Sequence, residues 1–138
     1  MTEVINQRPP IYESVIASGL RFNPESVLFA YDGKIWNPGG QELPTHLIAH
    51  EGVHLAQQDS YNGGCDAWWG RYLTDPYFRI GQEAEAYATQ YAFICGYVKD
   101  RNQRSRVLQD LAHYLSGPMY GNTISLSAAV KMIKQELI

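Results

Sequence analysis

The sequence predicts a helix-dominated α+β domain with a short β-hairpin and four to five helices. Most apolar residues recur at helical spacing, in segments bounded by proline, glycine and capping residues. One segment differs: residues 27–36 read VLFAYDGKIW, with β-rich pieces on both sides of Asp32-Gly33, the strongest signal for a two-residue hairpin. The 138 residues, 45% hydrophobic and 18% charged, are typical of one globular domain with its own core.

The first elements are a short helix and the hairpin. Residues 1–8 are expected to form a loose N-terminal arm, after which Pro9 and Pro10 open a helix that Gly19 ends. Its apolar stripe consists of Ile11, Val15, Ile16 and Leu20. The hairpin that follows has two interpretations, which the residues do not separate. Its edge strand could pair with an extended peptide, or the hairpin could cover one side of the core.

The next helix, from Thr45 to Gln58, contains the central motif, His50-Glu51-Gly52-Val53-His54, an H-E-x-x-H pattern. At 100° per residue, His50 and His54 point within about 40° of each other, so their imidazoles can hold one Zn²⁺. Glu51 lies on the same side, where it can reach a water on the metal. The alternative is a pair of hydrogen-bonded helix histidines beside a surface glutamate. Chance gives this motif in roughly one shuffled sequence in two hundred, which favours the metal site.

The remaining elements follow from turn and capping signals. Residues 59–74 are expected to form a loop, in which Trp68, Trp69 and Tyr72 make a short helix that packs one flank rather than walling a cleft. Asp75-Pro76 begins a second long helix, which runs to about Lys99. A third helix covers about 102–115, and Ser127 is expected to cap a last helix with Val130, Ile133 and Leu137 on one face.

A histidine pair needs a further donor, because catalytic zinc typically keeps three protein ligands and one open position. The best source is Gln82–Tyr87, which reads QEAEAY. Glu83 and Glu85 lie about 200° apart on a helix and cannot both face the metal, and the hydrophobicity of their neighbours does not decide between them. His46, one turn before His50, could be an outer hydrogen-bond partner or a ligand of a distorted site. A half-exposed helix residue is the preferred interpretation of His46.

Together, HEGVH and EAEAY resemble the gluzincin branch of zinc metallopeptidases, where H-E-x-x-H is completed by a glutamate on a following helix. The resemblance covers roughly residues 27–97 and implies a small zincin-like domain, with a likeness to the minimal gluzincins and to phage- and prophage-encoded peptidases of this kind. It implies that Glu83 is the third ligand. Tyr87 stands where an aspartate or asparagine often orients a ligand histidine, so a phenol would have to supply that hydrogen bond.

What the resemblance implies is zinc-assisted hydrolysis of a peptide or protein substrate. Zinc lowers the pKa of its bound water towards about 7, and Glu51 takes a proton from that water and passes it to the leaving amine. A tyrosine or histidine usually helps to hold the developing oxyanion. The candidates, which the sequence does not rank, are His113, Tyr114 and Tyr120.

Composition excludes several other classes. Because the net charge is −3, the chain is not expected to bind nucleic acid or an anionic membrane. With neither a signal peptide nor an apolar run of about 18 residues, the chain is expected to be cytoplasmic, with Cys65 and Cys95 as free thiols. Two alternatives to a peptidase stay open: a catalytically silent zinc-binding structural or interaction protein, and a regulator that acts on a single partner. The oligomeric state is not predicted.

Overall fold

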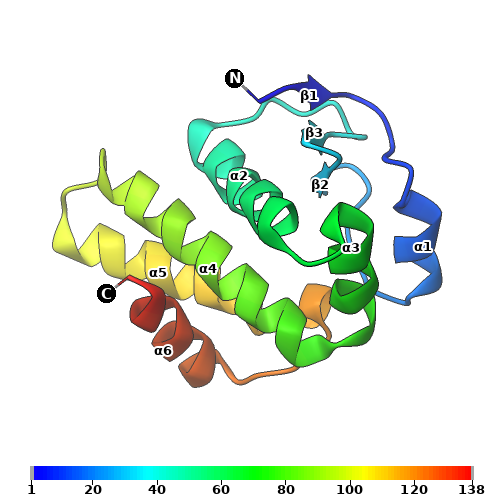
Figure 1. Cartoon of the computed structure of the whole chain (residues 1–138). Helices are drawn as coiled ribbons and strands as arrows, with labels where there is room; N and C mark the ends of the chain where they lie inside the picture. The colour runs from blue at the N-terminus through cyan, green and yellow to red at the C-terminus, as the bar shows by residue number, and fades with distance from the viewer. Residues whose placement is uncertain (1, 138) are drawn as a thin grey trace.

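The computed structural model describes residues 2–137 as a helix-dominated α+β fold with a small mixed sheet, which confirms the predicted fold class (Figure 1). The elements of these residues, in chain order, are β1 (Val4–Ile5), α1 (Tyr12–Ala17), β2 (Phe29–Tyr31), β3 (Lys34–Trp36), α2 (Thr45–Ser60), α3 (Gly64–Thr74), α4 (Pro76–Cys95), α5 (Arg101–Leu115), the short 3₁₀-helix η1 (Pro118–Tyr120) and α6 (Leu126–Glu136). No helix among residues 2–137 has the length and apolar character needed to span a membrane.

The sheet has the order β1-β3-β2, and its hairpin is the predicted one. Asp32 and Gly33 have φ values of +52° and +72°, the left-handed pair that a tight type I′ turn requires. The expected loose arm is wrong at Val4 and Ile5, which form β1 and pair in parallel with β3. A strand of two residues is too short to show an alternating pattern in the sequence. It is recognised only by its pairing with β3. Met1, also assigned to the arm, lies outside the described residues.

The hairpin covers the core, which favours the second of its two interpretations. Phe29 and Ala30 are 3% and 1% exposed. In a two-residue hairpin the carbonyl of Ala30 points away from β3, towards the outer edge. That carbonyl accepts hydrogen bonds from Gln58 Nε2 at 2.7 Å and Trp69 Nε1 at 2.9 Å. The outer edge at Ala30 is therefore bound by side chains of α2 and α3.

Of the two N-cap residues predicted, Asp75 is confirmed and Ser127 is not. Asp75 begins α4 by accepting a hydrogen bond from the Phe78 backbone N–H at 3.1 Å. The last helix begins earlier than predicted, because Ser125 rather than Ser127 is its N-cap and accepts from the Ala128 N–H at 3.1 Å. The two serines have the same capping chemistry. In the helix that begins after Ser125, Ala129 and Ile133 are completely buried, each 0% exposed.

Three further differences from the prediction concern the lengths of two helices and the exposure of one residue. The segment expected as a loop with a short helix contains α3, an eleven-residue helix, so residues 2–137 hold six α-helices rather than four to five. The predicted packing role of Trp68, Trp69 and Tyr72 is confirmed, because all three are buried. Helix α4 ends at Cys95, before Lys99. Ile16, placed on the apolar stripe of the first helix, is 49% exposed.

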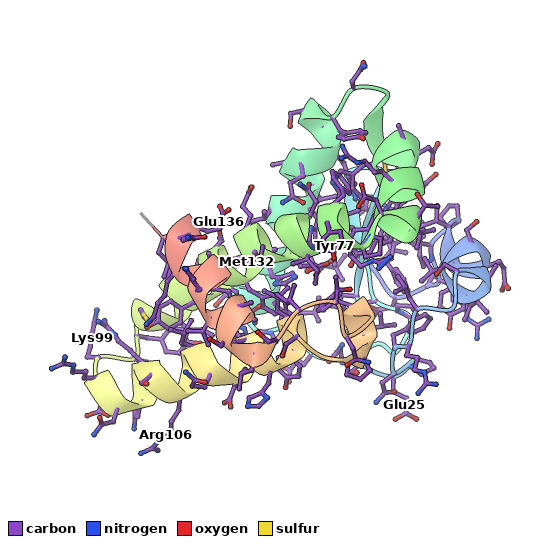
Figure 2. All side chains as sticks on the ribbon, turned by 90° about the horizontal axis from the view of Figure 1, so that it is seen from below. Glu25, Tyr77, Lys99, Arg106, Met132 and Glu136 are labelled. Atoms are coloured by element: carbon purple, nitrogen blue, oxygen red, sulfur yellow. The ribbon has the colours of Figure 1, made fainter. Side chains whose placement is uncertain are left out.

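Two hydrophobic clusters make up the core. One is formed by side chains of α4, α5, α6 and η1, and the other by side chains of α1, β2, α3 and the residues between α1 and β2. Figure 2 shows the side chains that fill the first cluster between α4, α5 and α6. Helix α4, which contributes to the first cluster, packs along α2, and this contact positions the site.

Candidate metal centre

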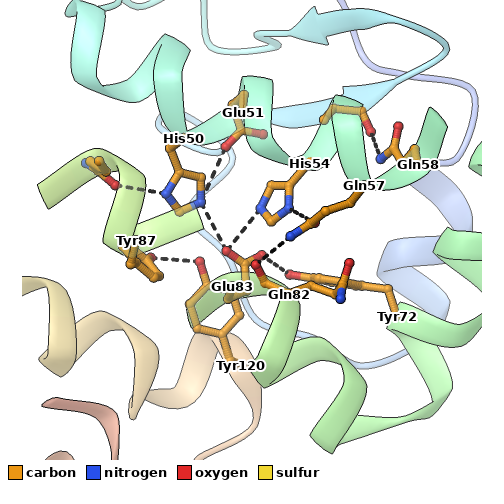
Figure 3. A network of polar contacts seen from close by, with 12 residues as sticks. His50, Glu51, His54, Gln57, Gln58, Tyr72, Gln82, Glu83, Tyr87 and Tyr120 are labelled. Carbon is orange, nitrogen blue, oxygen red and sulfur yellow. Dashed lines mark hydrogen bonds and ion pairs between the residues drawn. The ribbon is translucent and has the colours of Figure 1, made fainter. Parts of the chain in front are cut away.

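The site is built from one face of α2 and one residue of α4 (Figure 3). His50 and His54, one helical turn apart, direct their Nε2 atoms to the same carboxylate oxygen, Glu83 Oε1, at 3.0 and 3.1 Å. Glu51 lies beside them, with Oε2 3.8 Å from His50 Nε2. All four side chains are buried, with exposures between 4% and 8%. The structure therefore brings the motif residues His50, Glu51 and His54 together with Glu83, the glutamate that the resemblance implied.

The choice that the sequence left open between Glu83 and Glu85 is decided by the packing of α4. Glu83 is 4% exposed and lies against both histidines, whereas Glu85 is exposed to solvent. The neighbours of each glutamate include alanines because α4 is covered on more than one side, by α2, α3, α5 and α6. Because several faces of α4 are covered, the hydrophobicity of neighbouring residues could not show whether Glu83 or Glu85 faces the histidines.

Each of the three groups that converge has an outer hydrogen-bond partner. His50 Nδ1 lies 2.8 Å from Gln90 Oε1, and His54 Nδ1 lies 2.9 Å from Gln57 Oε1. The Tyr72 hydroxyl donates to Glu83 Oε2 at 2.6 Å. Such partners orient the ligands of metal sites and raise their basicity. The sequence patterns indicated none of the three in this role, although Gln57 stands one turn after His54 and Gln90 shares the face of Glu83.

The hydrogen bonds of Gln57 fix which nitrogen of His54 carries the proton. Gln57 Nε2 donates to the backbone carbonyl of Gln82 at 3.0 Å, which leaves Gln57 Oε1 facing His54 Nδ1. His54 Nδ1 must then be the N–H donor, and in a neutral imidazole Nε2 is the acceptor. Since Glu83 Oε1 is also an acceptor, the two atoms 3.1 Å apart need a positive charge between them.

Without a metal, that positive charge is a proton on imidazole. Burial alone would lower the pKa of His54, but the Glu83 carboxylate outweighs burial and raises the pKa above its ordinary value. Burial alone would raise the pKa of Glu83, but the two histidines hold it well below its usual range. Burial is the largest influence on Glu51 and raises its pKa. The point where the three groups meet therefore favours a cation.

The donor set also fits a divalent metal. Two imidazole nitrogens and one carboxylate oxygen are ligands that zinc takes. Zinc bonds of about 2.0–2.1 Å in a tetrahedron place neighbouring donors about 3.3 Å apart. The 3.0 and 3.1 Å separations to Glu83 Oε1 are close to that spacing. A ligand oxygen or nitrogen from each of His50, Glu51 and His54 also lies within 4.8 Å of the others.

Of the predicted outer residues, Tyr87 has different contacts from those expected, whereas His46 is a partly exposed helix residue as predicted. The Tyr87 phenol does not orient a histidine: its hydroxyl pairs with the Tyr120 hydroxyl at 2.8 Å, and its ring packs edge-on against the His50 ring, with centroids 4.5 Å apart. Gln90, three residues further along α4, is the residue that reaches His50 Nδ1. His46 is half-buried and accepts from Gln90 Nε2 at 2.9 Å, so it contacts the site through this glutamine. Burial, then the charge of His50, lowers the pKa of His46.

The candidates for holding an oxyanion are separated by the structure. Tyr120 is buried in η1 and lines the same cavity as the two histidines. His113, also predicted as a catalytic residue, is exposed and does not line that cavity, so the structure does not bring it to the two histidines. The inner side of α5 is formed instead by Leu108, Leu111, Ala112 and Leu115. Tyr114 is 61% exposed and lies among the lining residues.

A cavity of about 560 Å³ adjoins the site. Its apolar walls come from both hydrophobic clusters, with Val27, Phe29 and Trp69 from one and Leu111 and Tyr120 from the other.

Comparisons with protein-family models, curated proteins and solved structures found no match to this chain.

Proposed function

We propose that the protein is a zinc-dependent peptidase of the gluzincin type, in which His50, His54 and Glu83 hold the ion. The observation that carries this proposal is that His50 Nε2 and His54 Nε2, both on α2, lie 3.0 and 3.1 Å from Glu83 Oε1 on α4, next to the buried Glu51 carboxylate. Each of the three acceptor groups has its own hydrogen-bond partner, as catalytic metal ligands usually do.

Glu51 is assigned as the general base. A zinc ion held there would polarise a carbonyl and lower the pKa of water to about 7. Glu51 precedes His54 on the same face of α2, and its Oε2 lies 3.8 Å from His50 Nε2, at the edge of the ligand cluster. From that position it can accept a proton from water and return it to the leaving amine. Tyr120, held by Tyr87, would donate its O–H to the carbonyl oxygen of the substrate.

A peptide is the substrate class that the motif resemblance suggests, and the cavity is compatible with it. The apolar walls next to the site would accommodate apolar side chains of a bound peptide segment. The same site could instead act on a single partner protein. A panel of unrelated peptides separates these two specificities, because a general peptidase cleaves several of them and a single-target enzyme cleaves none.

A second candidate is a zinc-binding structural or interaction protein without turnover. The observation that favours it is the burial of Glu51, whose carboxylate lies close enough to the histidines to act as a fourth ligand. Structural zinc sites are closed in this way, whereas catalytic sites keep one position open. The two candidates differ in whether Glu51 is needed for metal binding or only for hydrolysis.

Glu51→Gln distinguishes the two candidates. We expect this variant to retain zinc at wild-type stoichiometry, measured by elemental analysis, while peptide hydrolysis falls by about 10²-fold or more because the base is lost. Loss of zinc together with activity would instead assign Glu51 as a ligand and favour the structural candidate. Hydrolysis by Glu51→Gln at the wild-type rate would exclude the proposed mechanism.

The third ligand is tested by a matched pair of substitutions on α4. Glu83→Gln should greatly weaken zinc binding, because a neutral amide replaces the carboxylate that faces both histidines. Glu85→Gln, an identical change two residues away on the exposed side, should bind zinc as the wild type does. Equal zinc affinities for the two variants in a competition titration would contradict the proposed ligand set.

A further inference from the structure

Glu83 is held from the side opposite to the histidines by a two-step chain of contacts. We propose that Tyr72 and Arg79 are positioning residues that restrict Glu83 to binding a metal ion through Oε1 alone. This inference rests on the proposed metal centre and adds to it the control of how the third ligand binds. Tyr72 lies in α3 and Arg79 in the first turn of α4, so both positioning residues are outside the two sequence motifs.

The first step is the hydrogen bond from Tyr72 to Glu83. A carboxylate can bind a metal through one oxygen or through both. The Tyr72 hydroxyl donates to Oε2 at 2.6 Å, whereas both histidines meet Oε1. A carboxylate accepts but does not donate, so the tyrosine must supply the proton of this bond. With Oε2 engaged, Oε1 is the oxygen left for an ion.

The second step fixes Tyr72 itself. Arg79 is only 5% exposed, and its Nε–H donates to the backbone carbonyl of Tyr72 at 3.0 Å, with a longer contact from Nη2 to the carbonyl of Leu73 at 3.5 Å. Its guanidinium also lies 5.6 Å from the centroid of the Tyr72 ring. The last carbonyls of a helix have no partner within the helix and carry partial negative charge. Arg79 therefore closes the C-terminal end of α3 on the residue whose phenol holds Glu83.

Aromatic packing supports the same arrangement. The Tyr72 ring stacks on the Trp68 ring, with centroids 4.9 Å apart and an interplanar angle of 24°. Trp68 Nε1 donates to Gln82 Oε1 at 2.8 Å, which ties α3 to the residue before Glu83. The ring of Tyr72 thus has a fixed plane, and Arg79 fixes its backbone. Together they determine where the hydroxyl lies relative to Glu83.

The test measures metal binding, not turnover alone. Apo protein of the wild type, Tyr72→Phe, Arg79→Met and the double variant is titrated with Zn²⁺ and, for its visible absorption, with Co²⁺. We expect Tyr72→Phe to lower zinc affinity by about 10- to 100-fold, because an outer hydrogen bond is lost. We also expect its cobalt spectrum to change, because Oε2 becomes free to coordinate. Arg79→Met should change both readouts in the same direction by a smaller factor.

The double variant tests whether Arg79 acts through Tyr72. If it does, Arg79→Met has no further effect on zinc affinity in the Tyr72→Phe background. Arg71→Met is the matched control, because Arg71 is a more exposed arginine at the same corner, paired with Asp75 at 3.3 Å. This control should retain the wild-type affinity and spectrum. Arg79→Lys, which keeps the positive charge, replaces Arg79→Met in the same cycle if the methionine variant does not fold.

Each result decides one part of the inference. An unchanged affinity and spectrum in Tyr72→Phe would overturn it entirely. Additive effects of the two substitutions would show that Arg79 supports the fold rather than Tyr72, and would remove Arg79 from the pair. If the wild-type protein binds neither ion, the proposed function fails before the variants are compared, so the two failures are distinguishable.

Discussion

At the scale of single residues, the centre is defined by hydrogen bonds that lie outside the H-E-x-x-H motif. The motif places two imidazoles on one face of a helix, but it does not determine which nitrogen of each ring is free. Gln57 decides this for His54, because its amide is itself fixed by the carbonyl of Gln82. Gln90 holds His50 in the corresponding way. These amides leave both Nε2 atoms as acceptors directed at one point.

Gln57→Leu should therefore weaken metal binding while leaving the motif intact. We expect zinc affinity to fall by about 10- to 100-fold, since His54 loses the acceptor that fixes its ring and tautomer. Competition with a chromophoric chelator measures this loss. Asp59→Asn, an exposed position on the same helix, is the control. A zinc affinity in Gln57→Leu equal to that of the control would show that the amide does not contribute.

At the scale of elements, side chains connect neighbours that are distant in sequence. The hairpin is joined to α3 by the Tyr31 hydroxyl, which donates to Asp66 Oδ1 at 2.7 Å, and to α2 by Gln58. The hydrogen bond to Asp66 is the main cause that raises the pKa of Tyr31 to about 12. The protonated phenol is the form that the fold favours. This contact consequently stabilises the protein only while Tyr31 keeps its proton.

The sign of the pH dependence follows from that shift. The pKa of Tyr31 is higher in the folded protein than the ordinary value of 10.0, so the contribution is complete below pH 10 and is lost as the pH rises towards about 12. We expect wild type to be more stable than Tyr31→Phe at pH 8–9, with a difference that disappears towards about pH 12. Urea unfolding across this range measures it, with the exposed Tyr77→Phe as control. A difference that grows with pH would contradict this sign.

At the scale of the whole molecule, the proposed metal links two long helices, α2 and α4. His50 and His54 lie on α2 and Glu83 on α4, two helices that pack along each other. The metal-free site buries two carboxylates and two histidines together. This burial lowers the free energy of unfolding unless protons neutralise the excess negative charge. A metal ion removes that cost and bridges the helices at the same time.

Metal removal should accordingly destabilise the entire fold. At a free zinc concentration about 100 times the Kd, the folded state gains about 2.7 kcal/mol, or roughly 10 °C in Tm for a domain of this size. Thermal unfolding with zinc and with a chelator measures the difference. Glu85→Gln should keep it and Glu83→Gln should lose most of it. A zinc-dependent shift of equal size in both variants would place the ion elsewhere.

Features that depend only on neighbouring residues could be predicted from the amino-acid sequence. Asp75 caps α4, Asp32-Gly33 turns the hairpin, and His50 and His54 share a helix face because each effect acts within a few residues. Tertiary structure alone decided that Glu83 rather than Glu85 faces the histidines, that Gln90 rather than Tyr87 contacts His50, and that His113 faces solvent. Those outcomes depend on how α4 and α5 pack against other elements. Local periodicity establishes which residues share a face, but only long-range packing determines what that face meets.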